Sequence, residues 1–288
     1  MGSLKEAILS DRGGVRVTGP DAHKLLQDLV TCDLEVVDRE RIGYGALLTP
    51  QGKILFAFHM VAVDDGYVLE CPAEFVADLE KRLRLYRLRA KVEIEALPEI
   101  KVSVIWGEGA ERLTGPENLA DPRHPALGAR KCHGLMQEGG EADIDQADER
   151  DWHAHRIALG IAEFGTDYPS GEMFPHDVNL DQSHGVAFEK GCYVGQEVVS
   201  RIRHRGTARR RVVLVEGTAD LAPGELMAGD RSLGPLAVSV GRQGLAVIRL
   251  DRAARALAAS VPITLDGDPV ELSLPPDVDY GWPEAGDD

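Results

Sequence analysis

Short apolar runs separated by turn residues recur over most of this chain and restrict the folds that it can adopt. In the N-terminal half, the runs that read as strands are 15–17, 44–48, 54–63, 67–71, 92–94 and 102–106. Between them, Phe75, Leu79 and Leu83 lie on an apolar stripe with helical spacing, and Pro72 stands where that helix would begin. Strands, a helix and further strands in this order are typical of an α+β fold with antiparallel sheets.

The pattern changes from about Val212, where the apolar runs become shorter and are interrupted by glycine and proline. These runs are 212–215, 236–240, 245–248, 263–265 and 270–274. Short strands at this spacing indicate a small β-barrel or sandwich, which we place at residues 209–275. Residues 276–288 are acidic and contain glycine and proline, so we expect a disordered tail.

Charge and cysteine content narrow the classes of partner. The chain has 32 basic and 48 acidic residues, a net charge of −16, so its surface repels nucleic acid and anionic membranes. No apolar stretch approaches the roughly 20 residues that cross a bilayer, and the N-terminus lacks the apolar region of a secretory signal. The four cysteines include no CxxC pair, which suits free thiols in a reducing compartment. We therefore expect a cytoplasmic monomer with no membrane partner, no nucleic-acid partner and no metal site.

The segment that carries the most chemical information surrounds Cys192. Gly191 and Gly195 flank the cysteine, and residues 196–206 have the pattern of a helix that ends at a glycine. A thiol at a helix N-terminus and close to Lys190 is biased toward the thiolate, which is a nucleophile or a soft-metal ligand. The alternative is that Cys192 is a small buried residue, as free cysteines often are.

The string Lys190–Glu197 reads Lys-Gly-Cys-Tyr-Val-Gly-Gln-Glu and is followed by an arginine at 201 and Arg-Gly at 205–206. It resembles the signature of the YgfZ-like proteins, a branch of the folate-binding glycine-cleavage T-protein superfamily. That branch includes bacterial members and a related mitochondrial iron–sulfur assembly factor. Further segments that are similar to the superfamily are 17–22, 48–53, 156–163 and 174–181.

This resemblance implies a T-protein-like ring of three domains around a central folate channel. It places residues 1–48 and 141–208 in a first domain that carries the cysteine motif, and residues 49–140 in a second α+β domain. The C-terminal β-barrel is the third. The implied function is a tetrahydrofolate-binding factor that supports assembly or repair of iron–sulfur proteins. The implied partners are folate and iron–sulfur client proteins or assembly factors.

The resemblance also suggests the site residues. Cys192 would be the reactive or ligating group, and Lys190 would tune its thiolate. The cofactor-binding set would be Gly191, Tyr193, Gly195, Gln196, Glu197, Arg201 and Asp177. Glu197 and Arg201 can pair one helical turn apart. The thiolate would either bond transiently to a client or cluster or react with a one-carbon unit carried by folate, and the sequence leaves both open.

One position departs from the T-protein enzyme. Its corresponding helix typically reads Arg-Leu-Glu-Ala-Gly, with the glutamate on the folate ring, whereas Ala158 stands at that place here. A methyl group cannot hydrogen-bond a pterin, so glycine-cleavage activity is not expected. The alternatives are a folate-dependent aminomethyl or methyl transferase or demethylase acting on a small amine, and a scaffold without chemistry.

Three further features have more than one interpretation. Six arginines between residues 201 and 211 form either an anion-docking surface, for example for the glutamate tail of folate, or a solvated helix end that pairs with acids of the chain. His176 and Asp177 either line the channel or belong to a plain turn. The four cysteines could also gather around a cluster, although their spacing does not indicate it.

Overall fold

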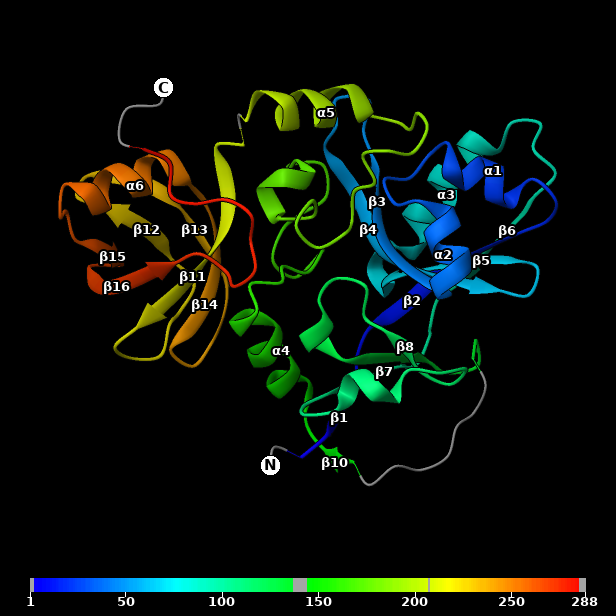
Figure 1. The fold of residues 1–288 in the computed structure, drawn as a ribbon, viewed down its shortest axis with the longest axis horizontal. Helices are drawn as coiled ribbons and strands as arrows, with labels where there is room; N and C mark the ends of the chain where they lie inside the picture. The colour runs from blue at the N-terminus through cyan, green and yellow to red at the C-terminus, as the bar shows by residue number, and fades with distance from the viewer. Residues whose placement is uncertain (1–2, 137–143, 207, 285–288) are drawn as a thin grey trace.

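The computed structural model describes residues 3–136, 144–206 and 208–284. Figure 1 shows a β-barrel at one end, a sheet with helices at the other end, and a second sheet below them. The loops that follow α4 (Glu149–Ala158) run through the space between these parts (Figure 1). This arrangement confirms the α+β class with a C-terminal barrel and places long loops where the three parts meet.

The larger sheet is antiparallel throughout and has the strand order β3-β4-β5-β2-β6. Its strands are β2 (Arg12–Thr18), β3 (Ile42–Leu48), β4 (Ile54–Val63), β5 (Gly66–Pro72) and β6 (Glu93–Leu97). Helices that pack on it are α1 (Ala22–Gln27), α2 (Leu34–Glu40) and α3 (Val76–Arg87), and a 3₁₀ turn, η1 (Ala73–Phe75), precedes α3. Their apolar faces form one core with side chains such as Val15, Leu26, Phe58 and Leu79.

The second sheet has the order β10-β1-β7-β9-β8. Its strands are β1 (Lys5–Leu9), β7 (Val102–Trp106), β8 (Leu119–Ala120), β9 (Ala129–Cys132) and β10 (Asp145–Gln146). The 3₁₀ turns η2 (Ala110–Leu113) and η3 (Pro125–Leu127) lie between them along the chain. The indole of Trp152 on α4 packs against Trp106, with 5.5 Å between ring centroids.

These two sheets correct the domain boundary that the sequence suggested at residues 48 and 49. That boundary falls between β3 and β4, which pair antiparallel from Ile42 opposite Val61 to Leu48 opposite Ile54. Strand β1, assigned to the first domain, pairs with β7, assigned to the second. Each sheet therefore combines strands from both expected domains, because strand pairing between distant segments cannot be read from local pattern.

The C-terminal barrel is closed, in the order β11-β14-β13-β12-β15-β16. Its strands are β11 (Arg210–Gly217), β12 (Glu225–Ala228), β13 (Arg231–Val240), β14 (Gln243–Arg249), β15 (Ile263–Leu265) and β16 (Asp268–Ser273), and α6 (Leu250–Ala258) follows β14. Buried side chains such as Val213, Leu226 and Ile248 fill its interior. Because the barrel is closed, each of its strands pairs on both sides, and no edge of these described strands is left for pairing with another chain.

The expected disordered tail is wrong for residues 276–284, which pack against the protein. The Tyr280 hydroxyl and the Asn179 side-chain amide are 2.9 Å apart, and the Arg211 guanidinium lies 4.5 Å from the Tyr280 ring centroid. Trp282 packs on the barrel core. The acidic composition suggested that conformational entropy would keep this segment disordered. Packing of its aromatic side chains offsets the entropy lost on ordering. Residues 285–288 lie outside the described residues.

A buried ionic cluster joins the two sheets. Glu70 on β5 is fully buried and accepts hydrogen bonds from Arg12 on β2 and from Arg130 on β9, the latter at 2.8 Å. Burial by itself would raise the pKa of Glu70, but the positive charges of Arg12 and Arg130 hold that pKa well below its usual range. The cluster continues through other buried ion pairs, Arg123–Asp121, Arg156–Asp167 and Arg156–Glu163.

Among the helices of the described residues, none has the length and apolarity that a bilayer crossing requires.

Candidate functional site

Cys192 lies on an exposed loop that leads into α5 (Gln196–Arg205). The other three cysteines, Cys32, Cys71 and Cys132, are at most 4% exposed, and burial raises the pKa of each of their thiols to about 12. All four cysteines are described, and Cys192 is the one whose sulfur solvent can reach. The alternative of a small buried residue is therefore wrong for Cys192.

Lys190 anchors this loop to the larger sheet domain. Its Nζ donates hydrogen bonds to the carbonyl oxygens of Val30, at 2.9 Å, and Cys32, at 2.7 Å. The same ammonium lies 5.5 Å from the centroid of the Tyr193 ring, and burial lowers the pKa of Lys190. Its charge is thus engaged with backbone dipoles and an aromatic face, and its proposed effect on the Cys192 thiolate stays a prediction.

The start of α5 docks onto the turn between β3 and β4. Gly195 is the N-cap of α5 with φ of 84°, and a Cβ there would lie 2.7 Å from the Thr49 carbonyl oxygen and 3.0 Å from the Gly52 Cα. Gly52 has φ of 82°, and a Cβ there would lie 2.9 Å from the Val198 Cβ. Two segments singled out from the sequence, 48–53 and 190–197, therefore touch through a pair of glycines that leave no room for a side chain.

We predict that Gly195→Ala destabilises the chain by about 2 kcal/mol or more, because alanine adds left-handed strain and an overlap with the backbone of the turn at Thr49 and Gly52. Urea unfolding followed by tryptophan fluorescence measures this change. Gly191→Ala is the matched control, since the backbone there is not left-handed and no atom lies within 4 Å of an added Cβ. We expect this control to stay within about 0.5 kcal/mol of wild type, and equal stabilities for the two variants would contradict the docking described.

The other predicted site residues differ in their burial and contacts. The Tyr193 ring is buried and its pKa is raised to about 12 by burial, whereas Glu197 and Arg201 are exposed and Gln196 is half-buried. Within the part of the chain that the structure describes, no ion pair joins Glu197 to Arg201. Asp177 is buried in the 3₁₀ turn η4 (Pro175–Val178), where its Oδ2 accepts a hydrogen bond from the Phe174 amide at 3.0 Å. Asp177 therefore stabilises this turn, and its role in cofactor binding stays a prediction.

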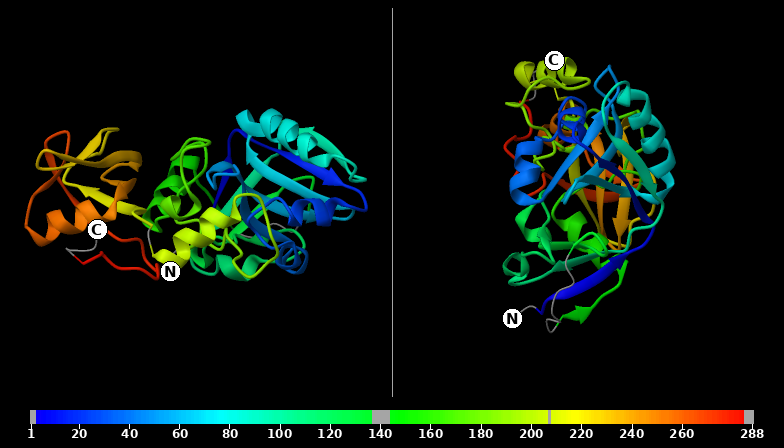
Figure 2. Two further views of the ribbon diagram at one scale, coloured as in Figure 1. Left: turned by 90° about the horizontal axis from the view of Figure 1, so that it is seen from above. Right: turned by 90° about the vertical axis from the view of Figure 1, so that its right-hand side faces the viewer.

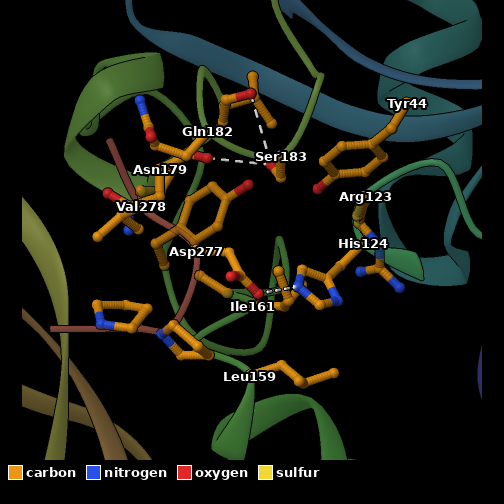
Figure 3. A pocket seen from close by; sticks show the side chains of 17 residues that line it. Tyr44, Arg123, His124, Leu159, Ile161, Asn179, Gln182, Ser183, Asp277 and Val278 are labelled. Carbon is orange, nitrogen blue, oxygen red and sulfur yellow. Dashed lines mark hydrogen bonds and ion pairs between the residues drawn. The ribbon is translucent and has the colours of Figure 1, made fainter. Parts of the chain in front are cut away.

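A pocket, here called the central pocket, lies where the loops after α4, the larger sheet and the tail meet (Figure 3). Tyr44, Arg123 and His124 line one side, and Asn179 and Ser183 line the other (Figure 3). Residues 275–278 form a further wall, and the Oδ2 of Asp277 lies 3.2 Å from the Nε2 of His124. Cys192 does not line this pocket.

Tetrahydrofolate does not fit the central pocket as it stands. The buried Arg123 Nη1 has no hydrogen-bond partner among the described residues, so the lining offers a donor of the right kind. The volume, however, is about 30 Å³, space for one or two water molecules, whereas small-molecule sites usually occupy about 300–1,000 Å³. Ala158, at the expected folate-contacting position, is exposed at the end of α4 and does not line this pocket, although Leu159 and Gly160 do.

The cysteines do not form a metal site. Within the described residues, no three histidine, cysteine or acidic side chains come together in a way that could hold a metal ion. Cys32 and Cys71 belong to the core of the larger sheet, and Cys132 belongs to the core of the second sheet. The interpretation in which the four cysteines surround one cluster is therefore not supported by this arrangement.

Comparison with known proteins places the chain in a family. It is 33% identical to the human mitochondrial iron–sulfur cluster assembly factor IBA57, over 88% of this chain and 83% of that protein. The chain belongs to the IBA57 family. The mouse IBA57 protein is 32% identical, over 84% of this chain and 76% of the relative, and the IBA57 homologue of Pyricularia oryzae is 31% identical, over 91% and 74%. The YgfZ-like resemblance noted from the cysteine motif is thereby confirmed.

Two further comparisons concern the fold of this IBA57 family member. Residues 209–280 match the model of the CAF17 C-terminal β-barrel domain. The crystal structure of the glycine cleavage system aminomethyltransferase T from Bartonella henselae superposes with a TM-score of 0.67 at 14% identity, covering 94% of this chain and 85% of that one. At this identity the likeness establishes the T-protein-like fold and carries no statement about activity.

The IBA57 comparisons correct one expectation. The sequence suggested a cytoplasmic protein, but the human, mouse and fungal relatives are mitochondrial proteins by name. Scattered free cysteines indicate a reducing environment, and that property does not distinguish one such compartment from another.

Proposed function

We propose that this chain supports iron–sulfur cluster assembly and that it acts through the exposed thiol of Cys192. The role rests on its membership of a family whose relatives are named iron–sulfur cluster assembly factors. The assignment of Cys192 as the acting residue rests on one observation. Cys192 is exposed on a loop that Lys190 and Gly195 fix to the fold, while the other three thiols are buried.

The surroundings of Cys192 suit contact with another protein. No atom lies within 4 Å of the position that a Gly191 Cβ would occupy, so the fold itself does not require glycine there. A glycine beside an exposed thiol lets a partner's backbone or a bulky inorganic group approach the sulfur closely. Clusters are commonly held by four cysteine thiolates. A single exposed thiol would supply one of them, so a partner would supply the others.

Tetrahydrofolate binding stays a prediction, and no step of this proposal depends on it. The central pocket, at about 30 Å³, would have to enlarge before a pterin could enter. The transferase and demethylase alternatives need a folate site and a carboxylate beside it. The pocket is too small for folate and Ala158 is exposed outside it, so the geometry does not favour them.

Selective alkylation tests the proposal. Brief treatment of the native chain with N-ethylmaleimide should modify one cysteine, because three thiols are buried, and peptide mass spectrometry should assign the label to Cys192. Added to an extract depleted of the chain, the unmodified protein should restore activity of an iron–sulfur enzyme, and the alkylated protein should not. Cys192→Ser should take up no label under the same conditions. Full activity of the singly alkylated chain would refute the role of this thiol.

A further inference from the structure

A wide groove separates α5 from the barrel and is distinct from the central pocket. It has a volume of about 710 Å³, within the usual range of small-molecule sites. Its walls come from the loop 176–188, the C-terminal half of α5, the start of β11 and the tail around Tyr280. Figures 1 and 2 show α5, β11 and the tail side by side. Cys192 does not line this groove, so what it binds is independent of the function proposed above.

His176 forms part of the groove wall and has unused hydrogen-bonding capacity. Its side chain is 2% exposed, and neither ring nitrogen has a hydrogen-bond partner among the described residues. Burial lowers the pKa of His176, which leaves a neutral ring with one donor and one acceptor. A buried polar side chain without a partner is unfavourable for the folded state. Its place on the wall of a groove therefore points to a polar ligand.

Arginines give the groove a positive lining on a strongly acidic protein. Arg203, Arg205 and Arg209 are exposed there, and no ion pair engages them within the described residues. The Arg203 guanidinium lies 3.8 Å from the centroid of the Phe188 ring, which restricts its position. The chain as a whole carries a net charge of −16, so three arginines without an ion-pair partner in the described part of the chain form a local positive region on an acidic protein.

The acidic residues of the groove are mostly engaged. Asp181 holds Arg211 through two hydrogen bonds of 2.6 and 3.0 Å, and Asp251 pairs with Arg249 at 2.7 Å. Asp279 is the remaining carboxylate of the lining. Three free guanidinium groups thus face one free carboxylate, and the groove attracts anions.

We propose that this groove binds a small polyanion, a molecule with at least two carboxylate or phosphate groups. Guanidinium groups bind both kinds of anion through charge-assisted hydrogen bonds, and the neutral His176 ring can add a further hydrogen bond. The volume accommodates a molecule of metabolite size rather than a single inorganic ion.

Calorimetric titration of the full chain tests this site, with tripolyphosphate as the phosphate probe and citrate as the carboxylate probe. We expect saturable one-to-one binding of at least one probe, and the tighter probe identifies the anion class. The double variant R203Q/R209Q should bind at least tenfold more weakly, and His176→Phe at least threefold more weakly. The matched control R87Q/R89Q removes the same charge from exposed positions at the end of α3 and should stay within twofold of wild type.

Two outcomes would overturn the site. One is the absence of saturable binding of both probes at 1 mM. The other is equal weakening in R203Q/R209Q and in R87Q/R89Q, which would mean that net charge alone governs the binding. Arg203 and Arg209 are exposed and not part of the core, so R203Q/R209Q should fold normally. Its binding therefore tests the site even if His176→Phe lowers stability.

Discussion

Replacing Glu70 by alanine is expected to destabilise the chain by about 3–5 kcal/mol, the largest effect that we predict for a single substitution. Glu70 is fully buried and receives the guanidinium groups of Arg12 and Arg130. Without its carboxylate, two buried positive charges would lose their main counter-charge at the junction between the two sheets. Desolvating an unpaired charge costs far more than an exposed ion pair contributes.

Urea unfolding of wild type and Glu70→Ala, followed by circular dichroism, measures this loss. Glu95→Ala is the matched control, since Glu95 is exposed on β6 of the same sheet and should change stability by less than about 0.5 kcal/mol. A loss below about 1 kcal/mol for Glu70→Ala would show that the cluster does not hold the two sheets together as the contacts indicate.

The strands and the barrel could be predicted because their signals are local. The run 44–48 corresponds to β3 (Ile42–Leu48), 54–63 to β4 (Ile54–Val63) and 67–71 to β5 (Gly66–Pro72). Turn residues mark the ends of these runs in the sequence. The five runs from residue 212 onward likewise indicated short strands of a barrel or sandwich. The family resemblance favoured the barrel, and the structure shows it closed.

The pairing of strands and the ionic cluster could not be predicted in the same way. Strand β1 pairs with β7, and only tertiary structure brings these segments together. The sequence does contain one signal for the buried ionic cluster. Glu70 stands between Leu69 and Cys71 in an apolar run, and His59 stands inside another. A charged residue at such a place predicts a buried partner, although it does not identify Arg12 or Arg130.

The candidate site shows the same division between local and tertiary information. The glycine-flanked motif predicted a loop before a helix, and the structure places Cys192 there, exposed. The contacts of Lys190 with the carbonyls of Val30 and Cys32 depend on distant segments. Proximity in sequence suggested that Lys190 tunes the Cys192 thiolate, and this role stays a prediction. The contacts that fix Lys190 in the fold could not be read from the sequence.

Cys192→Ser is expected to abolish the contribution of this chain to iron–sulfur enzymes while leaving its stability within about 0.5 kcal/mol of wild type. Serine keeps the size and exposure of the side chain, so the loop and α5 should be unchanged. It removes the sulfur that would bind a cluster. The effect on function should therefore be large although the effect on folding is small.

The most direct measurement is the activity of iron–sulfur enzymes in cells whose own copy of the gene is replaced by a variant. With Cys192→Ser we predict activities as low as in cells that lack the chain. Glu189→Gln, an exposed change in the same loop, should retain wild-type activities at equal protein levels. Wild-type enzyme activities in the Cys192→Ser cells would contradict the account.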